Sequence, residues 1–85
     1  MNANPKYNRI KVALAVRDHT NKWLAEKLGR AEMTVSRWAS NKSQPSIEQL
    51  FEIANVLDMD ARYLLYSPND VTVGSMPESK MDKLG

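Results

Sequence analysis

The sequence predicts an all-α fold built from five short helices. Apolar residues recur three and four positions apart in several segments, which is the spacing of one buried helix face. Residues that favour helix ends separate these segments, such as Thr20, Gly29 and Ser46. No pair of segments shows the alternating pattern of neighbouring strands, and the chain has no internal repeat. Short helices joined by tight turns therefore form the expected bundle.

The composition limits both size and chemistry. The 85 residues, 9.7 kDa in mass, suit one small domain. The longest apolar run, residues 12–16, is far shorter than the roughly 20 residues that cross a bilayer, so no membrane association is expected. The N-terminus lacks the apolar stretch of a signal peptide. The chain has no Cys and a single His, which excludes disulfides and Cys- or His-rich metal sites.

The first predicted helix follows a flexible segment, residues 1–7. Asn8 is expected to cap a helix that runs to about Arg17. Its apolar side chains lie on two faces, so we expect it to be covered on more than one side: Ile10, Ala13 and Leu14 on one face, Val12 and Val16 on the other.

The second and third predicted helices are close together in the sequence. Thr20 is expected to cap residues 21–28, and Gly29 to end that helix in a left-handed conformation. The third helix spans residues 32–40, followed by Asn41 as a second left-handed position. Four apolar side chains of this pair are assigned to the core: Leu24, Leu28, Val35 and Trp38.

The fourth helix, residues 47–57, begins with a capping box of Ser46 and Gln49. Its apolar face is expected to comprise Ile47, Leu50, Ala54 and Leu57, widened by Phe51 and Ile53. Asp60 is expected to cap a fifth helix, residues 61–66, with Leu64 and Leu65 turned inward. The domain is thus predicted to span residues 8–66, and residues 67–85 form a short, flexible polar tail.

Charge is distributed unevenly along the chain. Residues 1–45 contain nine Lys or Arg and three acids, a local net charge of +6, whereas residues 46–85 sum to −4. A basic half favours a polyanion such as nucleic acid, although a solvated basic surface without a partner fits equally well. No phosphate-binding Gly loop, metal-ligand spacing or His-assisted nucleophile is present, so an enzyme is not expected.

Residues 20–46 carry the functional motif. Two helices with Ala25 at their crossing and Gly29 in the turn fit a helix-turn-helix, whose second helix enters the DNA major groove. With Val35 and Trp38 buried, the opposite side of that helix presents Glu32, Met33, Ser36 and Arg37.

These residues resemble the Cro/repressor-type helix-turn-helix domain of the XRE family of bacterial and phage regulators. The similarity covers residues 8–66 and rests on Thr20, Leu24 to Gly29, Thr34 to Trp38, Lys42, Pro45-Ser46, Leu57 to Asp60 and Leu64-Leu65. The resemblance implies a five-helix, lambda-repressor-like DNA-binding domain in the cytoplasm. It also implies a transcriptional regulator, expected to be a repressor, that binds double-stranded operator DNA as a homodimer. No cofactor, metal or small-molecule ligand is expected.

The resemblance also implies site residues. Base contacts are expected from Glu32, Met33, Ser36 and Arg37, and DNA-backbone contacts from Asn21, Lys22, Thr34, Ser40, Asn41, Lys42 and Ser43. Four positions depart from the family pattern: Ala31 and Ala39 replace a capping Ser or Thr and a common Glu, Asn41 replaces Gly, and Trp23 replaces a polar residue.

Several roles stay open from the sequence. Arg37 fits a guanine edge or only a phosphate, and Glu32 fits a base or only the helix dipole. Trp23 fits packing against a helix or contact with DNA or a partner, while His19 is expected to be solvated. Three residues near the end of the domain form a dimer interface or simply close the core: Tyr63, Leu65 and Tyr66. The alternative function is that of an antitoxin-like or adaptor protein, which acts mainly through protein–protein binding and uses the Met-bearing tail.

Overall fold

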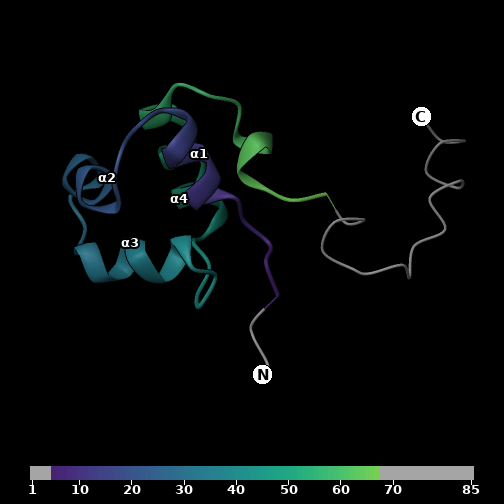
Figure 1. Cartoon of the computed structure of the whole chain (residues 1–85), viewed down its shortest axis with the longest axis horizontal. Helices are drawn as coiled ribbons and strands as arrows, with labels where there is room; N and C mark the ends of the chain where they lie inside the picture. The colour runs from purple at the N-terminus through teal and green to yellow at the C-terminus, as the bar shows by residue number, and fades with distance from the viewer. Residues whose placement is uncertain (1–4, 68–85) are drawn as a thin grey trace, which may run out of the picture.

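The structure, a computed structural model, describes residues 5–67 as four α-helices and one short 3-10 helix (Figure 1). The helices are α1 (Ile10–Val16), α2 (Asn21–Leu28), α3 (Glu32–Ala39), α4 (Ile47–Leu57) and η1 (Ala61–Leu64). Within the described residues there is no strand, only an isolated antiparallel bridge between Asn8 and Leu65. The all-α prediction is confirmed, whereas the fifth α-helix is not found. Of the predicted tail, residues 67–85, all but Ser67 lie outside the described residues.

Most helix ends match the chemistry predicted for them. The Thr20 side chain accepts from the Trp23 amide, and Ser46 and Gln49 form the complete capping box. Gly29 and Asn41 have φ of 68° and 62° and so adopt the predicted left-handed conformation. Asp58 ends α4 in the same conformation, with φ of 55°, which the sequence did not indicate.

The first and last helices are shorter than predicted. The side-chain oxygen of Asn8 does accept from the Ile10 amide, at 3.0 Å, but α1 begins at Ile10 and ends at Val16. At the other end of the domain, Asp60 caps η1 as expected, yet the helix stops at Leu64. It stops there because Tyr66 donates its amide to the Tyr7 carbonyl at 3.0 Å instead of extending the helix.

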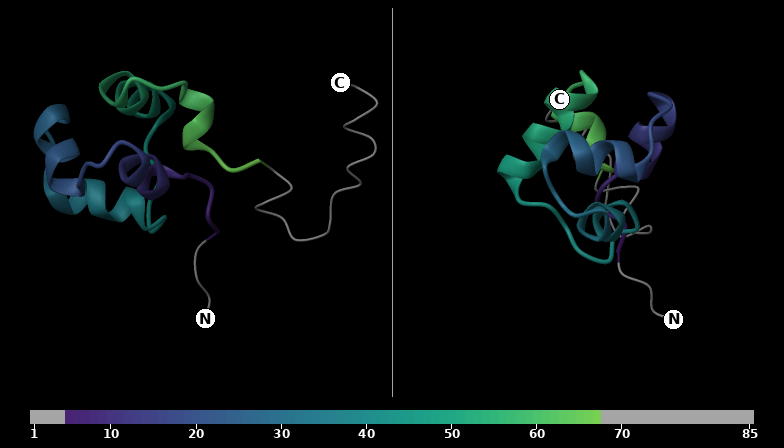
Figure 2. Two further views of the ribbon diagram at one scale, coloured as in Figure 1. Left: turned by 45° about the horizontal axis from the view of Figure 1, so that its top comes forward. Right: turned by 90° about the vertical axis from the view of Figure 1, so that its left-hand side faces the viewer.

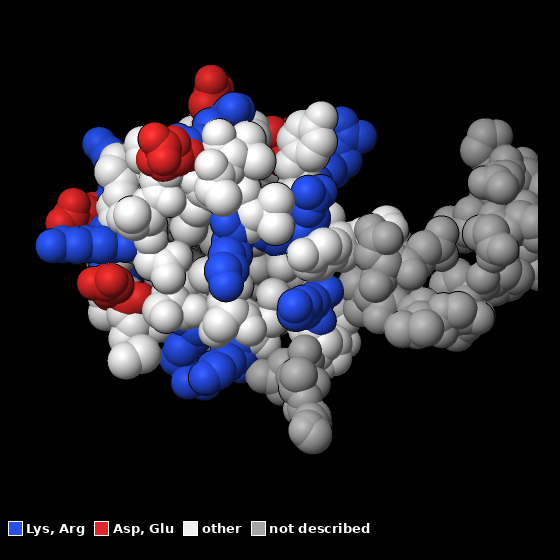
Figure 3. All heavy atoms as spheres, viewed as in Figure 1, with Lys and Arg blue, Asp and Glu red and all other residues white. Residues whose placement is uncertain are grey.

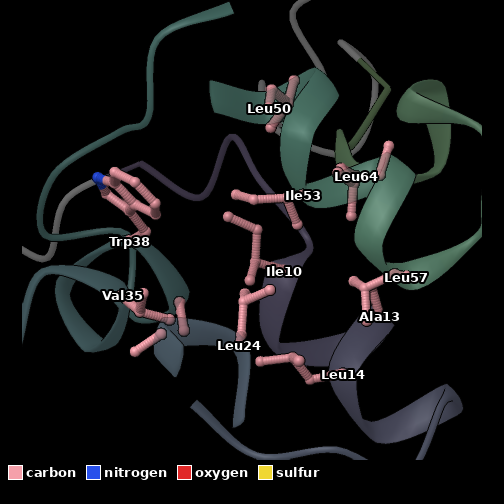
Figure 4. Close-up of a cluster of buried hydrophobic side chains, with 13 residues drawn as sticks. Ile10, Ala13, Leu14, Leu24, Val35, Trp38, Leu50, Ile53, Leu57 and Leu64 are labelled. Carbon is pink, nitrogen blue, oxygen red and sulfur yellow. The ribbon is translucent and has the colours of Figure 1, made fainter. Parts of the chain in front are cut away.

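One hydrophobic core holds the four helices and η1 together (Figure 4). In this view the side chains of α1, α2, α3, α4 and η1 converge. Its fully buried members are Ile10, Leu24, Val35, Ile53 and Leu64. α2 packs closely on α3 and also against α4, as the two views of Figure 2 illustrate. The core therefore holds α3 through its buried side chains, Val35, Trp38 and Ala39.

Several apolar side chains assigned to the core lie at the surface instead. Val16, Ile47 and Phe51 are 66%, 69% and 63% exposed, and Leu65 is 44% exposed. Leu28 is only half-buried, although it does pack against the core. The reason is size: helices of 7 to 11 residues in so small a domain have one covered face, so side chains on a second apolar face stay in solvent.

Candidate nucleic-acid interface

The α2–turn–α3 unit presents one face of α3 to solvent. Gly29 ends α2 in a left-handed conformation, and because no atom lies within 4 Å of the place that a Cβ would occupy, the backbone angle is what requires glycine. Ala25 is buried, and its small side chain lets α3 cross closely. Val35 and Trp38 anchor α3 in the core, as predicted. The opposite face of α3 is consequently free of the protein.

The four residues predicted to contact bases lie on this free face. Glu32, Met33 and Arg37 are exposed, Met33 to 69%, and Ser36 is half-buried. Within residues 5–67 the ion pairs join Arg30 to Glu52 and Arg62 to Asp60, so Arg37 has no acidic partner there. A free guanidinium, a carboxylate, a hydroxyl and a thioether thus lie along one side of α3, all suited to the edges of base pairs.

The start of α2 offers amides to an anion. The Trp23 amide donates a hydrogen bond to the Thr20 hydroxyl oxygen. The amides of Asn21 and Lys22 have no protein acceptor in the described part of the chain. Free first-turn amides and the helix dipole favour a phosphate at this position. The exposed Lys22 side chain adds a positive charge beside them.

The start of α3 lacks a side-chain cap. Ala31 has the extended backbone of an N-cap residue, with φ of −67° and ψ of 143°, but no side chain that could accept a hydrogen bond. Glu32 in the first turn provides a negative charge near the positive end of the dipole. Thr34, predicted to contact the DNA backbone, is half-buried in the same helix.

The segment after α3 offers side chains rather than amides. The amides of residues 40–43 all donate to carbonyls of α3, and the Ser40 hydroxyl donates to the Ser36 carbonyl at 3.0 Å. Lys42 is exposed and Ser43 half-buried, so both can reach a phosphate through their side chains. Ser40 could offer its hydroxyl proton only by giving up the bond to Ser36.

Asn41 is a correction to the predicted backbone contacts. It is 5% exposed, and its side chain turns into the protein. Its side-chain oxygen accepts from the amides of Tyr7 and Asn8, both at 3.0 Å, and its NH₂ group donates to the Asn8 carbonyl. The sequence indicated its left-handed backbone but contained no signal for this inward amide. The same bonds hold Tyr7, which was assigned to the flexible segment.

An aromatic pair lies at the start of α2. The rings of His19 and Trp23 stack with centroids 3.5 Å apart, and the Lys27 ammonium lies 5.8 Å from the Trp23 centroid. Trp23 packs against the core, in line with the packing alternative, whereas His19 is half-buried rather than solvated. The spacing of 19 and 23 was the available signal, because residues four apart meet across a helix start.

The predicted dimer residues lie at the opposite end of the domain from the α2–α3 turn. Tyr63 is 64% and Leu65 44% exposed, while Tyr66 is half-buried with its ring 5.6 Å from the Arg9 guanidinium. A groove of about 430 Å³ adjoins them, formed by α1, the end of α4 and η1. Its apolar lining includes Val12, Val16, Met59 and Tyr63. The valines of α1, predicted to be covered within the bundle, belong instead to this surface.

In Figure 3, Lys and Arg are spread over this face of the domain, and several of them gather at its lower edge, below the end of α3. Asp and Glu lie mainly toward the top and left of the same view. On η1 the side-chain hydrogen bond from Arg62 lowers the pKa of Asp60 to about 2. In the described part of the chain, no group of three or more possible ligands could hold a metal, and no helix there is long and apolar enough to cross a membrane.

Comparisons with known proteins point to the same unit. A family model described as Helix-turn-helix (HTH_3) matches residues 17–64. A crystal structure described as "a putative DNA-binding protein from Bacteroides fragilis" is 53% identical in sequence, with a TM-score of 0.70. The alignment covers 71% of this chain and 97% of that one. A search of curated proteins found no match.

Proposed function

The chain belongs to the helix-turn-helix family HTH_3, and from this membership we propose that it is a sequence-specific regulator of transcription, acting as a repressor. The membership confirms the resemblance drawn from the motif of residues 20–46. One observation supports the proposal above all others. Val35 and Trp38 anchor α3 in the core, while its outer face is exposed and its Arg37 has no acidic partner in the described residues. Such a regulator would act in the cytoplasm of a bacterial or phage-infected cell.

In the proposed complex α3 lies in the major groove. Arg37 donates two hydrogen bonds to O6 and N7 of a guanine, and Glu32 accepts from the amino group of a cytosine. Met33 contacts a thymine methyl group, and Ser36 reaches an adjacent base edge. These are the side chains that lie along one face of α3, so a single docking geometry serves all four.

Phosphate contacts fix the position of α3. We assign them to the free amides and side chains of Asn21 and Lys22 at one end of the unit, and to Lys42 and Ser43 at the other. Thr34 and Ser40 remain proposed contacts of lesser weight, since Thr34 is half-buried and the Ser40 hydroxyl is engaged.

The proposed assembly is a homodimer on a two-fold operator. Tyr63 and Leu65 supply exposed apolar surface, and Tyr66 lies beside them. The groove along α1 extends this surface through Val12 and Val16. Because α3 takes no part in lining it, two copies can pair there while both α3 helices stay free for DNA.

Selection of bound sequences from a random duplex pool tests the proposal. We expect enrichment of a two-fold site that contains a guanine in each half. Replacement of that guanine by 7-deazaguanine then removes only N7, a major-groove atom. This change in the DNA should weaken binding by the wild-type protein and leave binding by Arg37→Ala unaffected. Failure to enrich any sequence would instead favour the antitoxin-like or adaptor function.

A further inference from the structure

The N-terminal segment, residues 5–9, is bound to the segment that follows α3 by a cluster of amide side chains, of which Asn8 and Asn41 are buried and Gln44 is exposed. The cluster comprises Asn8, Asn41 and Gln44. Asn8 donates its NH₂ group to the Trp38 carbonyl at 2.9 Å and to the Gln44 side-chain oxygen at 2.7 Å. Gln44 in turn donates to the Asn41 side-chain oxygen at 2.9 Å. Each amide in the cluster both donates and accepts, so the two buried amides, Asn8 and Asn41, have partners for their oxygen and their NH₂ group.

The same segment is bound on its other side as well. Its backbone pairs with the chain after η1: Arg9 donates to the Leu64 carbonyl at 2.7 Å, and Tyr66 donates to the Tyr7 carbonyl. The Tyr7 amide donates to Asn41. Residues 7–9 therefore lie between the end of α3 and the end of η1. Figure 2 shows this segment (purple) leaving the domain on the side where α3 lies.

This arrangement brings two lysines to one region. Lys6 directly precedes Tyr7, Lys42 directly follows Asn41, and the Tyr7 amide is bonded to the Asn41 side chain. Both lysines are exposed, and neither has an acidic partner within residues 5–67. The backbones that carry these two lysines are adjacent, so both exposed side chains add positive charge to one region, which favours a polyanion.

We propose that Lys6 binds a DNA phosphate next to the one bound by Lys42, and that Asn41 is the positioning residue that holds it there. The inference rests on the proposed function, because it requires the protein to bind duplex DNA. It assigns a DNA contact to a residue outside the helix-turn-helix motif. It also explains why Asn occupies a left-handed position that glycine would fill with less strain: the amide holds Tyr7 and Asn8.

The slope of log K against log salt for the full chain on its selected duplex measures the phosphate contacts. Loss of one contact flattens the slope by about 0.9, so Lys6→Ala should match Lys42→Ala in this respect. Lys27→Ala is the control, because that ammonium lies over the Trp23 ring. It should keep the wild-type slope. If Lys6→Ala also keeps the wild-type slope while Lys42→Ala flattens it, Lys6 binds no phosphate and the inference is overturned. If the wild type fails to select any duplex, the proposed function fails first.

Asn41→Gly tests the positioning role. Glycine accepts the φ of 62° but removes the amide, so the helices should remain folded while residues 5–8 are released. We expect the slope of this variant to match that of Lys6→Ala, with no further change in the double variant. We also expect rapid hydrogen exchange at the Tyr7 and Asn8 amides, which should be protected in the wild type. If Lys6→Ala changes the slope by the same amount in the wild type and in Asn41→Gly, Asn41 does not position Lys6 and its proposed role is overturned.

Discussion

Arg37 shows how one side chain becomes available for recognition. Its neighbours Val35 and Trp38 are 0% and 4% exposed, so the helix turns Arg37 away from the core. Its guanidinium has no acidic partner in the described residues and keeps its planar fork for a ligand. A fork of this kind matches O6 and N7 of guanine, whereas an ammonium forms a less directional contact. Specificity is therefore expected to depend on this residue more than on any other.

Substitution of Arg37 distinguishes base reading from phosphate binding. Arg37→Ala should cost about 1–3 kcal/mol on the preferred site and relax the preference at one base pair in each half. Arg37→Lys should retain most affinity for random DNA but lose that preference. Titrations of the three proteins with a matched site and a singly substituted site measure both effects. Equal losses on the two sites would assign Arg37 to a phosphate.

At the scale of the elements, helix ends position the interface. Thr20, Gly29 and Ser46 could be assigned from sequence because their effect is local: a side chain or a backbone angle acts within one turn. The contacts of Arg17 could not, since it donates to the Leu57 and Asp58 carbonyls some 40 residues away. The inward amide of Asn41 and the early end of η1 depend on tertiary contacts in the same way. The face of α3 was predictable because it follows from the spacing of Val35 and Trp38.

The uncapped start of α3 can be improved. Ser in place of Ala31 would accept a hydrogen bond from a first-turn amide, because the backbone there is already extended. Ala31→Ser should raise the free energy of unfolding by about 0.5–2 kcal/mol. Urea denaturation measures the change, and an unchanged m-value shows that the unfolded state is unaffected. No gain in stability would mean that α3 does not begin at Glu32 in solution.

The Asp60 cap of η1 predicts a pH effect. Its pKa of about 2 lies below the ordinary 3.8, chiefly because Arg62 donates a side-chain hydrogen bond to the carboxylate. The group therefore stabilises the fold above pH 3.8, and this stabilisation is lost as the pH falls toward 2. Asp60→Asn keeps a capping oxygen but loses the charge. The difference in unfolding midpoint between the two proteins should shrink from pH 5 to pH 2; a constant difference would contradict this role.

At the scale of the whole molecule, the proposed function assigns separate tasks to two surfaces. The basic half of the sequence contains α3 and the segments around it, whereas the acidic half contains α4 and η1. The groove between α1, the end of α4 and η1 combines apolar side chains with Arg9, Arg17 and Asp58, so we propose that it takes a protein partner with both apolar and charged groups. Under the proposed function, surfaces placed apart in this way would allow one domain to pair with a second copy and bind DNA at the same time.

Charge placed in the groove should separate pairing from folding. Val16→Asp and Tyr63→Asp replace side chains that are 66% and 64% exposed, so they should scarcely alter stability. Both should reduce dimerisation and weaken binding to a site whose halves lie about 10–10.5 base pairs apart. Phe51→Asp, equally exposed but outside this groove, is the control. Light scattering with and without DNA gives the stoichiometry; a 1:1 complex for the wild type would contradict the dimer.

The central claim is that α3 reads a DNA sequence, and the ratio of two dissociation constants tests it most directly. The purified full chain is titrated with its selected duplex and with a duplex of the same composition in shuffled order, at one salt concentration. A sequence-reading protein should prefer the selected duplex by at least about 10³-fold. Affinities within about tenfold of each other, both falling alike with salt, would mean that the basic surface only attracts phosphates and that α3 reads no sequence.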